Sequence, residues 1–206
     1  MKLLAYEVDK RPFLGVFNEN ETWAYPISAA GMEYRSMKDL IREAGPSEME
    51  MLDYISKKAP GDVTGAAPVE EIRIVSPIPE PDQDIICLGI NYMDHAAESA
   101  RFQKEEFARP EKAIYFSKRV NRTNDPDGII PAHKNLTNQL DYEAELAVII
   151  KKDAKDVKPE EVKDYIFGYT IMNDVSAREV QTEHKQWYFG KSLDGFTPLG
   201  PCIMTV

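Results

Sequence analysis

The sequence predicts an α+β fold that is rich in β-strands. Short apolar runs with β-branched members recur along the chain, and glycine, proline and asparagine residues separate them. Segments with helical patterning are fewer and short. A hydrophobic fraction of 43% beside 29% charged residues allows 206 residues to bury a real core. We therefore expect one domain of moderate size with a smaller appendage.

Residues 1–70 are expected to form the appendage, a small module with a β-hairpin and helices. Its predicted strands are apolar segments separated by polar turns, at residues 2–6, 14–17 and 22–25. Residues 37–44 and 48–57 have helical character, and Gly45 followed by Pro46 breaks the chain between them.

Residues 71–206 are expected to form the main domain, in which strands mix with short helices. The predicted strands are the apolar runs at residues 72–75, 85–88, 113–116, 146–150 and 169–172. A helix is predicted over residues 159–167, because Pro159 suits a first turn and Gly168 suits a position past the end. Residues 198–206 resemble the start of a further strand.

Composition excludes several classes of function. A net charge of -10 leaves no basic patch to neutralise phosphates, which argues against nucleic-acid binding. No apolar run approaches the roughly 20 residues that span a bilayer, and no basic segment precedes an apolar one at the N-terminus. We therefore expect a cytoplasmic protein that does not bind membranes. The only cysteines, Cys87 and Cys202, are expected to be reduced thiols.

Two glutamates open the apolar run at residues 146–150. Glu143 and Glu145 are two residues apart, so their side chains share one face of a strand. Adjacent carboxylates repel each other unless a cation lies between them. Such a pair taken alone is more often a solvated face, but the apolar run predicts a buried strand. Asp174 ends the next apolar run and would complete an oxygen site for Mg²⁺, Mn²⁺ or Ca²⁺ if the two strands are neighbours.

The chain resembles the fumarylacetoacetate hydrolase family in four segments that follow one another in order: residues 89–98, 141–146, 173–181 and 190–192. It is similar in particular to the short-chain branch of acylpyruvate hydrolases, oxaloacetate decarboxylases and hydroxymuconate-type isomerases. The resemblance covers about residues 70–206 and implies a β-roll with mixed strands. Family members continue well past the position of Val206, so we expect a catalytic domain that lacks its C-terminal part.

The resemblance also assigns roles to residues at matching positions. The metal ligands would be Glu143, Glu145 and Asp174. The catalytic groups would be His95, Glu98 and Lys191, of which the first two prepare a water molecule or move a proton. The substrate would be bound by Tyr92, Arg178 and Gln181. Judged without the resemblance, the spacing of His95 and Glu98 is typical of a surface hydrogen bond on a helix, and a lysine is ordinarily solvated.

The resemblance implies a divalent-metal-dependent hydrolase that cleaves a C–C bond in a 2,4-dioxo acid such as an acylpyruvate. Mg²⁺ or Mn²⁺ would be the cofactor, with Ca²⁺ as a substitute, and would stabilise an enolate. His95 with Glu98 would activate water to attack the C4 carbonyl. The same enolate serves an isomerase of hydroxymuconate-type acids or a decarboxylase of oxaloacetate, so both alternatives stay open. The expected partners are a small anionic 2-oxo acid and a second copy in a homodimer.

An alternative of another class is a non-catalytic remnant that binds metal for structure alone. The presence of both His95 and Glu98 argues against it, because a structural ion needs no group that moves protons. Gly190-Lys191-Ser192 does not predict a phosphate-binding loop, because the motif needs a glycine where this chain has Lys185. His133 and His184 lack cysteine or histidine neighbours at zinc spacing.

Overall fold

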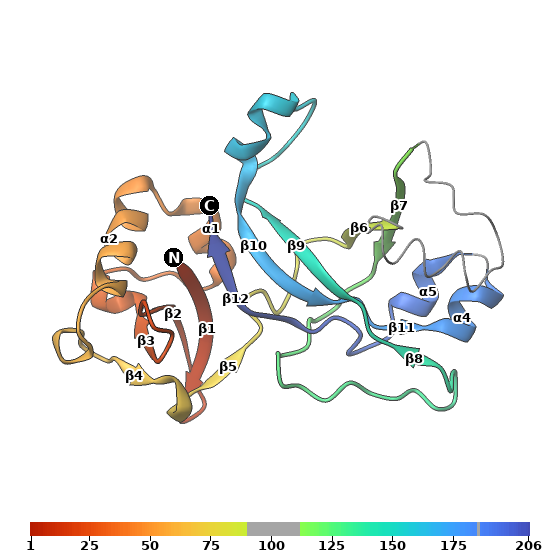
Figure 1. Cartoon of the computed structure of the whole chain (residues 1–206), viewed down its shortest axis with the longest axis horizontal. Coiled ribbons are helices and arrows are strands. Elements are labelled where there is room, and N and C mark those ends of the chain that lie inside the picture. Colours follow the sequence, from red (N-terminus) through yellow and green to blue (C-terminus); the bar gives the residue numbers. More distant parts are fainter. Residues whose placement is uncertain (90–111, 185) are drawn as a thin grey trace.

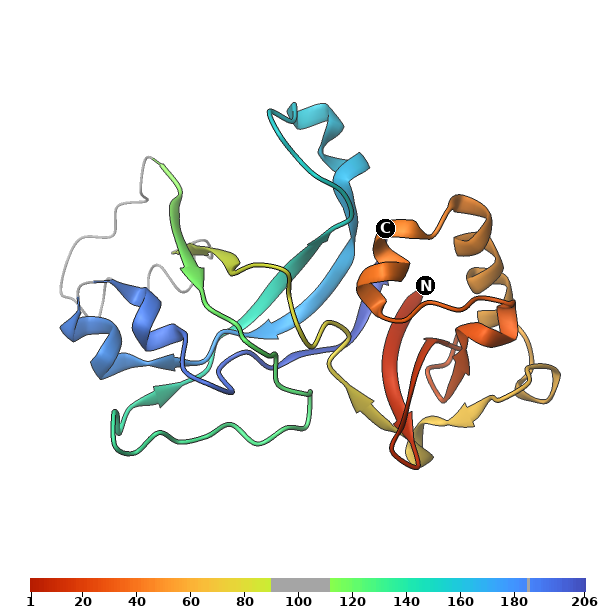
Figure 2. The ribbon, with the colours of Figure 1, turned by 180° about the vertical axis from the view of Figure 1, so that it is seen from behind.

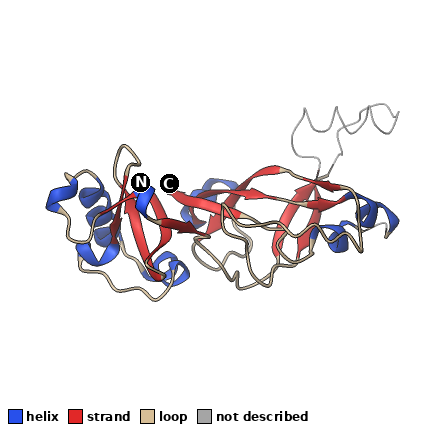
Figure 3. Cartoon of the chain, turned by 90° about the horizontal axis from the view of Figure 1, so that it is seen from below, coloured by secondary structure: helices blue, strands red, loops and turns tan. Residues whose placement is uncertain are grey.

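The structure is a computed structural model of the chain and describes residues 1–89, 112–184 and 186–206. An eight-stranded sheet runs through it in the order β4-β3-β2-β1-β12-β10-β9, with β5 paired to β1 beside this path. Two smaller sheets, β6 with β7 and β8 with β11, lie at the end away from the N-terminus (Figure 1). The view from below shows an elongated molecule with helices at both ends (Figure 3). The predicted β-rich α+β class is confirmed.

The elements of the N-terminal part match the prediction closely. They are β1 (Lys2–Val8), β2 (Arg11–Phe17), β3 (Trp23–Pro26), η1 (Ile27–Ala30), α1 (Met37–Glu43), α2 (Pro46–Ser56), η2 (Pro60–Asp62), β4 (Ala67–Pro68) and η3 (Val69–Glu71). Asp9 and Lys10 both have positive φ and join β1 to β2, as a tight hairpin turn with a primed twist requires. The Ser36 side chain accepts a hydrogen bond from the Asp39 N–H and so begins α1.

The remaining elements carry the candidate site. They are β5 (Arg73–Val75), β6 (Ile85–Gly89), β7 (Ile114–Lys118), β8 (Leu140–Asp141), β9 (Ala144–Ile150), η4 (Pro159–Tyr165), β10 (Ile166–Asn173), β11 (Ser176–Ala177), α4 (Arg178–Glu183), α5 (Trp187–Lys191) and β12 (Leu199–Thr205). The predicted helix at 159–167 is a 3₁₀ helix that ends at Tyr165, because β10 begins at Ile166. Helices α4 and α5 were not predicted.

One strand, β12, joins the two parts of the chain. It pairs antiparallel with β1 through Leu3 and Ile203, and with β10 on its other side. Seen from behind, β12 runs from the site region back to the N-terminal strands (Figure 2). Leu3, Phe167 and Ile203 are buried in one core cluster with residues of α1 and α2. The predicted division near residue 70 stays a prediction.

The prediction that the run 146–150 is a buried strand is wrong in one respect. The strand exists as β9, but its side chains alternate between half-buried and exposed. Leu146 and Val148 are 61% and 46% exposed, and Ile171 opposite Leu146 on β10 is 58% exposed. Ala147 and Ile149 instead pack against core clusters. The outer face of this strand pair is therefore about half exposed among the described residues, and sequence apolarity alone could not reveal that.

Among the helices that the structure describes, none combines the length and the apolar character that crossing a bilayer requires.

Candidate active site

The two long strands β9 and β10 bring the predicted acidic residues together. Asn173 lies opposite Ala144 and Met172 lies opposite Glu145 in an antiparallel register. The backbone N–H of Asp174 donates to the carbonyl of Glu143 at 2.8 Å, which continues the pairing by one position. Residues opposite each other in an antiparallel pair share a face, as do residues two apart. Glu143, Glu145 and Asp174 therefore lie on one face at one end of the strand pair.

Lys191 joins two of these carboxylates. It is the last residue of α5, and its Nζ donates to Glu143 Oε2 at 2.8 Å and to Asp174 Oδ2 at 2.7 Å. Its side chain is only 3% exposed, and the ammonium lies 5.2 Å from the centre of the Phe116 ring. The structure thus brings Lys191 together with two of the predicted acidic residues, and its catalytic role stays a prediction. A lysine is ordinarily exposed to solvent, but Lys191 is buried and its charge is compensated by two carboxylates.

A second lysine, Lys118, reaches the same aspartate and was missed in the sequence. It ends β7, its side chain is 0% exposed, and its Nζ donates to Asp174 Oδ1 at 2.6 Å. The same Nζ donates to the carbonyl of Val175 at 3.0 Å. Burial lowers the pKa of the Lys118 ammonium, and the charge and hydrogen bond of Asp174 oppose that shift. Lys118 lies two residues past the strand predicted at 113–116, and no pattern in the sequence marked it as a site residue.

Arg178, at the start of α4, holds Glu143 from the other side. Its Nη2 lies 2.8 Å from Glu143 Oε1. Its Nε and Nη2 donate to Asp141 Oδ2 at 2.9 and 2.6 Å, and its Nη1 donates to Gln181 Oε1 at 3.0 Å. Burial lowers the pKa of Arg178, but the bond to Asp141 and the two carboxylate charges outweigh burial, so the pKa is raised. The structure thus brings Arg178 and Gln181 together and adds Asp141, while the role of the first two in substrate binding stays a prediction.

The cysteine beside the site is not a nucleophile in this setting. Cys87, on β6, packs with Met172 and Leu199 beneath the strand pair. Burial, and then the negative charge of Asp174, raises the pKa of its thiol to about 12. The thiolate that nucleophilic chemistry needs is therefore absent near neutral pH. Neither Cys87 nor Cys202 forms a disulfide, which agrees with the prediction of reduced thiols.

Glu143 and Asp174 offer carboxylate oxygens, the donor atoms that a hard divalent cation prefers. Each of Glu143 and Asp174 directs one carboxylate oxygen to a common point, which the Lys191 ammonium occupies in the structure. Oxygen donors of this kind suit Mg²⁺ or Mn²⁺. In the described ranges no group of three or more His, Cys, Asp or Glu side chains is arranged to hold a metal ion. The role of Glu145 as a third ligand therefore stays a prediction.

Three predicted site residues lie outside the described residues: Tyr92, His95 and Glu98. Their roles in substrate binding and proton movement stay predictions. The other two histidines are engaged elsewhere, His133 Nε2 with the carbonyl of Asp194 at 2.9 Å and His184 Nδ1 with that of Val180 at 3.1 Å.

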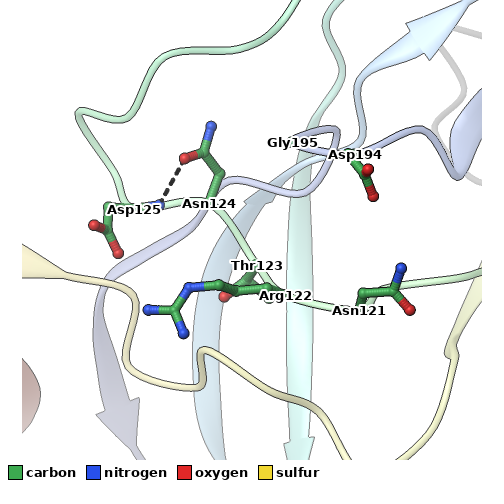
Figure 4. A pocket seen from close by; sticks show the side chains of 7 residues that line it. All are labelled: Asn121, Arg122, Thr123, Asn124, Asp125, Asp194 and Gly195. Atoms are coloured by element: carbon green, nitrogen blue, oxygen red, sulfur yellow. Dashed lines mark hydrogen bonds between the residues drawn. The ribbon is translucent and has the colours of Figure 1, made fainter.

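An open pocket of about 250 Å³, lined mostly by polar residues, lies between the loop after β7 and the loop after α5. Its lining residues are Asn121, Arg122, Thr123, Asn124, Asp125, Asp194 and Gly195 (Figure 4). The first of its two lining segments begins at Asn121, three residues after Lys118. The second begins at Asp194, which is three residues after Lys191. The Asn124 side chain is bound within its own loop by the Asp125 N–H. No carboxylate of the Glu143 and Asp174 pair lines this cavity.

The region that carries these contacts is similar in sequence to known proteins. The sequence profile described as "Fumarylacetoacetate (FAA) hydrolase C-terminal" matches residues 84–206. The "Oxaloacetate tautomerase YisK" of Bacillus subtilis (strain 168) is 41% identical over 149 residues, which are 71% of this chain and 48% of that protein.

Two solved structures share the fold. A fumarylacetoacetate hydrolase from psychrophilic Exiguobacterium antarcticum superposes with a TM-score of 0.76 at 33% identity, over 100% of this chain and 66% of that one. A 5-carboxymethyl-2-hydroxymuconate delta-isomerase from Mycobacterium smegmatis gives 0.66 at 26% identity, over 100% of this chain and 67% of that one. The chain thus spans about half to two thirds of the length of these relatives. The expected β-rich fold is confirmed, and the chain belongs to the fumarylacetoacetate hydrolase family of enzymes.

Proposed function

We propose that the site moves a proton within a small anionic 2-oxo acid, as an isomerase or tautomerase that uses a divalent metal ion. The observation that carries this proposal is the convergence of Glu143 Oε2 and Asp174 Oδ2 on the ammonium of buried Lys191. Support comes from the two relatives named above for oxaloacetate tautomerase and delta-isomerase activities. Both names describe a shift of a double bond and a proton without cleavage of the carbon skeleton.

The chain's own residues supply charge and orientation for such a reaction. Glu143 and Asp174, with Glu145 on the same face, would hold a divalent ion, which supplies Lewis-acid stabilisation to a developing enolate. Lys191 Nζ carries protons beside the same oxygens, so it can bind the substrate's carboxylate or 2-oxo oxygen. Arg178 adds a second positive charge next to Glu143, and its side chain is 31% exposed. These charges favour an anionic substrate in a chain of net charge -10.

A second candidate is hydrolysis of the C–C bond of a 2,4-dioxo acid. The observations that favour it are the paired His95 and Glu98 in the sequence and the similarity to a structure named as a fumarylacetoacetate hydrolase. In this reaction His95 would take a proton from water while the same carboxylates and Lys191 hold the acid end of the substrate. Association into a homodimer stays a prediction under either candidate.

Turnover of two substrates separates the candidates. The chain is incubated with Mg²⁺ or Mn²⁺ and either oxaloacetate or acetylpyruvate, and loss of the enol absorbance is followed while released pyruvate is measured with an indicator enzyme. We expect enol absorbance of oxaloacetate to change without pyruvate release, and to stop changing with a chelator. Pyruvate from acetylpyruvate would favour the hydrolase, and pyruvate from oxaloacetate the decarboxylase.

The variant Lys191→Met links turnover to the described site. Removal of its charge should lower kcat/KM by at least about tenfold, because a hydrogen bond to a charged group is worth about 1.5–3 kcal/mol. Lys57→Met is the matched control, since Lys57 pairs with Asp53 on the exposed surface. Equal activities of the two variants would contradict the proposal.

A further inference from the structure

Glu179, which follows Arg178 on α4, makes contacts that the proposed function does not use. Its Oε2 accepts hydrogen bonds from the Thr137 hydroxyl at 2.9 Å and from the Asn138 N–H at 2.8 Å. Thr137 is only 3% exposed. The bond from the Asn138 N–H, and then that from Thr137, lowers the pKa of the Glu179 carboxyl, so this group keeps its charge near neutral pH. Glu179 therefore fixes a loop that lies 41 and 42 positions before it in the chain.

Further hydrogen bonds connect this loop to Arg178. Thr137 Oγ1 accepts from the Gln139 N–H at 3.0 Å, and the Gln139 carbonyl accepts from the Arg178 N–H at 2.9 Å. Residues 137–139 are thus attached to the first turn of α4 at two successive positions, by the backbone at Arg178 and by the side chain at Glu179.

The same loop continues into β8, whose last residue, Asp141, orients the guanidinium of Arg178. Asp141 lies opposite Ser176 of β11, and its Oδ2 accepts from both Nε and Nη2 of Arg178 at 2.9 and 2.6 Å. Both residues of β8 are exposed. A pair of strands this short is only marginally stable alone. The position of Asp141 therefore depends on what holds the residues just before it.

We propose that Glu179 and Asp141 are positioning residues for Arg178: Glu179 fixes residues 137–139, and Asp141 then orients the guanidinium toward the anionic group of the substrate. Nη1 carries two N–H groups, and among the described residues it donates only to Gln181. Its other N–H is the donor that this orientation offers to the substrate. The inference rests on the proposed function for the anionic ligand, but the orientation of the guanidinium can be measured without turnover.

The test follows exchange of the Arg178 Nε–H with solvent by heteronuclear NMR. The signal is identified by its absence in Arg178→Lys. Glu179→Met removes the acceptor oxygens, Glu179→Gln retains one, and Glu183→Met is the matched control at the exposed end of α4. Circular dichroism establishes that each variant is folded. Because loss of one hydrogen bond is worth up to about tenfold in an equilibrium and two are lost, we expect at least about tenfold faster exchange in Glu179→Met and near wild-type exchange in the other two.

Steady-state kinetics in the oxaloacetate assay links this orientation to substrate binding. Glu179→Met should raise KM at least about threefold at nearly unchanged kcat, because a bond to the anionic group is made equally in the ground state and the transition state. Glu179→Gln should restore the KM of wild type, which a merely structural loss would not predict.

Unchanged exchange in Glu179→Met would overturn the inference, as would an unchanged KM in a chain that turns over oxaloacetate. Thr137→Val decides the matter if Glu179→Met does not fold, because it removes the hydroxyl between Glu179 and Gln139 at nearly constant volume. Faster exchange in a chain whose wild type converts none of the tested acids would support the positioning of Arg178 and refute the proposed function.

Discussion

Asp174 is the residue on which the charges of the site depend. Two lysine ammonium groups bind its two oxygens, and its side chain and that of Lys118 are almost completely buried. A buried ion pair costs desolvation energy that only a well-placed partner offsets. Removal of the aspartate charge therefore leaves Lys118 with a carbonyl as its remaining described partner.

The substitution Asp174→Asn should destabilise the fold by about 3–5 kcal/mol, the usual cost of breaking a buried pair. Asp82→Asn is the matched control, because Asp82 also binds two cations, Lys38 and Arg42, but on the surface. It should cost no more than about 1 kcal/mol. Urea unfolding followed by circular dichroism measures both. Similar losses of unfolding free energy in the two variants would show that burial of the Asp174 ion pair does not increase the cost of breaking it.

The sequence predicted the acidic residues of the site better than their basic partners. Glu143 and Asp174 stand at the ends of apolar runs, and Lys191, Arg178 and Gln181 were assigned through family motifs. Lys118 carried no such signal, because a lysine is exposed by default and its partner Asp174 lies 56 positions away. The fold brings the end of β7 beside Asp174 and the Val175 carbonyl, and these two groups hold the Lys118 ammonium inward.

Strands were more predictable than helices in this chain. Apolar runs with β-branched residues located β1, β2, β9 and β10 to within a few residues. Helices α4 and α5 are short, and polar, aromatic and glycine residues interrupt any apolar periodicity in them. The outer face of β9 was mispredicted, because which face of a strand is covered depends on the rest of the fold and not on the strand itself.

The contact between α4 and α5 positions Gln181 and Lys191, two of the predicted site residues. A Cβ on Gly190 would lie 2.6 Å from the backbone nitrogen of Gln181, so Gly190→Ala must push the helices apart. We expect a loss of about 1–3 kcal/mol in the free energy of unfolding, as for other overpacked sites, together with lower kcat/KM as Lys191 moves.

Gly61→Ala is the control for this substitution, since a Cβ there meets nothing within 4 Å. Its stability should equal or slightly exceed that of wild type. Urea unfolding and the oxaloacetate assay are run on both variants. Retention of full stability and activity in Gly190→Ala would refute the close approach of the two helices.

The whole molecule is held together by one sheet that crosses the predicted domain boundary. β12 pairs with β1 of the N-terminal part and with β10 of the site region. The largest core cluster also draws on both parts, with Leu3 and Leu52 beside Phe167 and Ile203. Shared pairing and a shared core favour unfolding as one cooperative unit.

The two tryptophans test this cooperativity, since Trp23 lies on β3 and Trp187 on α5 at the other end. In Trp187→Phe the fluorescence reports only the N-terminal part, and in Trp23→Phe it reports only the site region. We expect the urea midpoint by fluorescence to equal that by circular dichroism within each variant. Separate midpoints would show that the two parts unfold independently and would support the predicted boundary.

The pairing of β1 with β12 also bears on the order in which the strands can pair during synthesis. The N-terminal ammonium of Met1 and the Thr205 hydroxyl, which form a hydrogen bond at 3.2 Å, are 204 positions apart. A ribosome that adds about 5–20 residues per second would complete β12 on the order of 10–40 s after β1. During that interval the β1–β2 hairpin can form locally and β5 can pair with residues 5–7 of β1, while the part of this edge at Lys2 and Leu3 remains unpaired and able to recruit a strand from another nascent chain. Productive folding of this chain therefore depends on keeping its first strand from a wrong partner until β12 has been made.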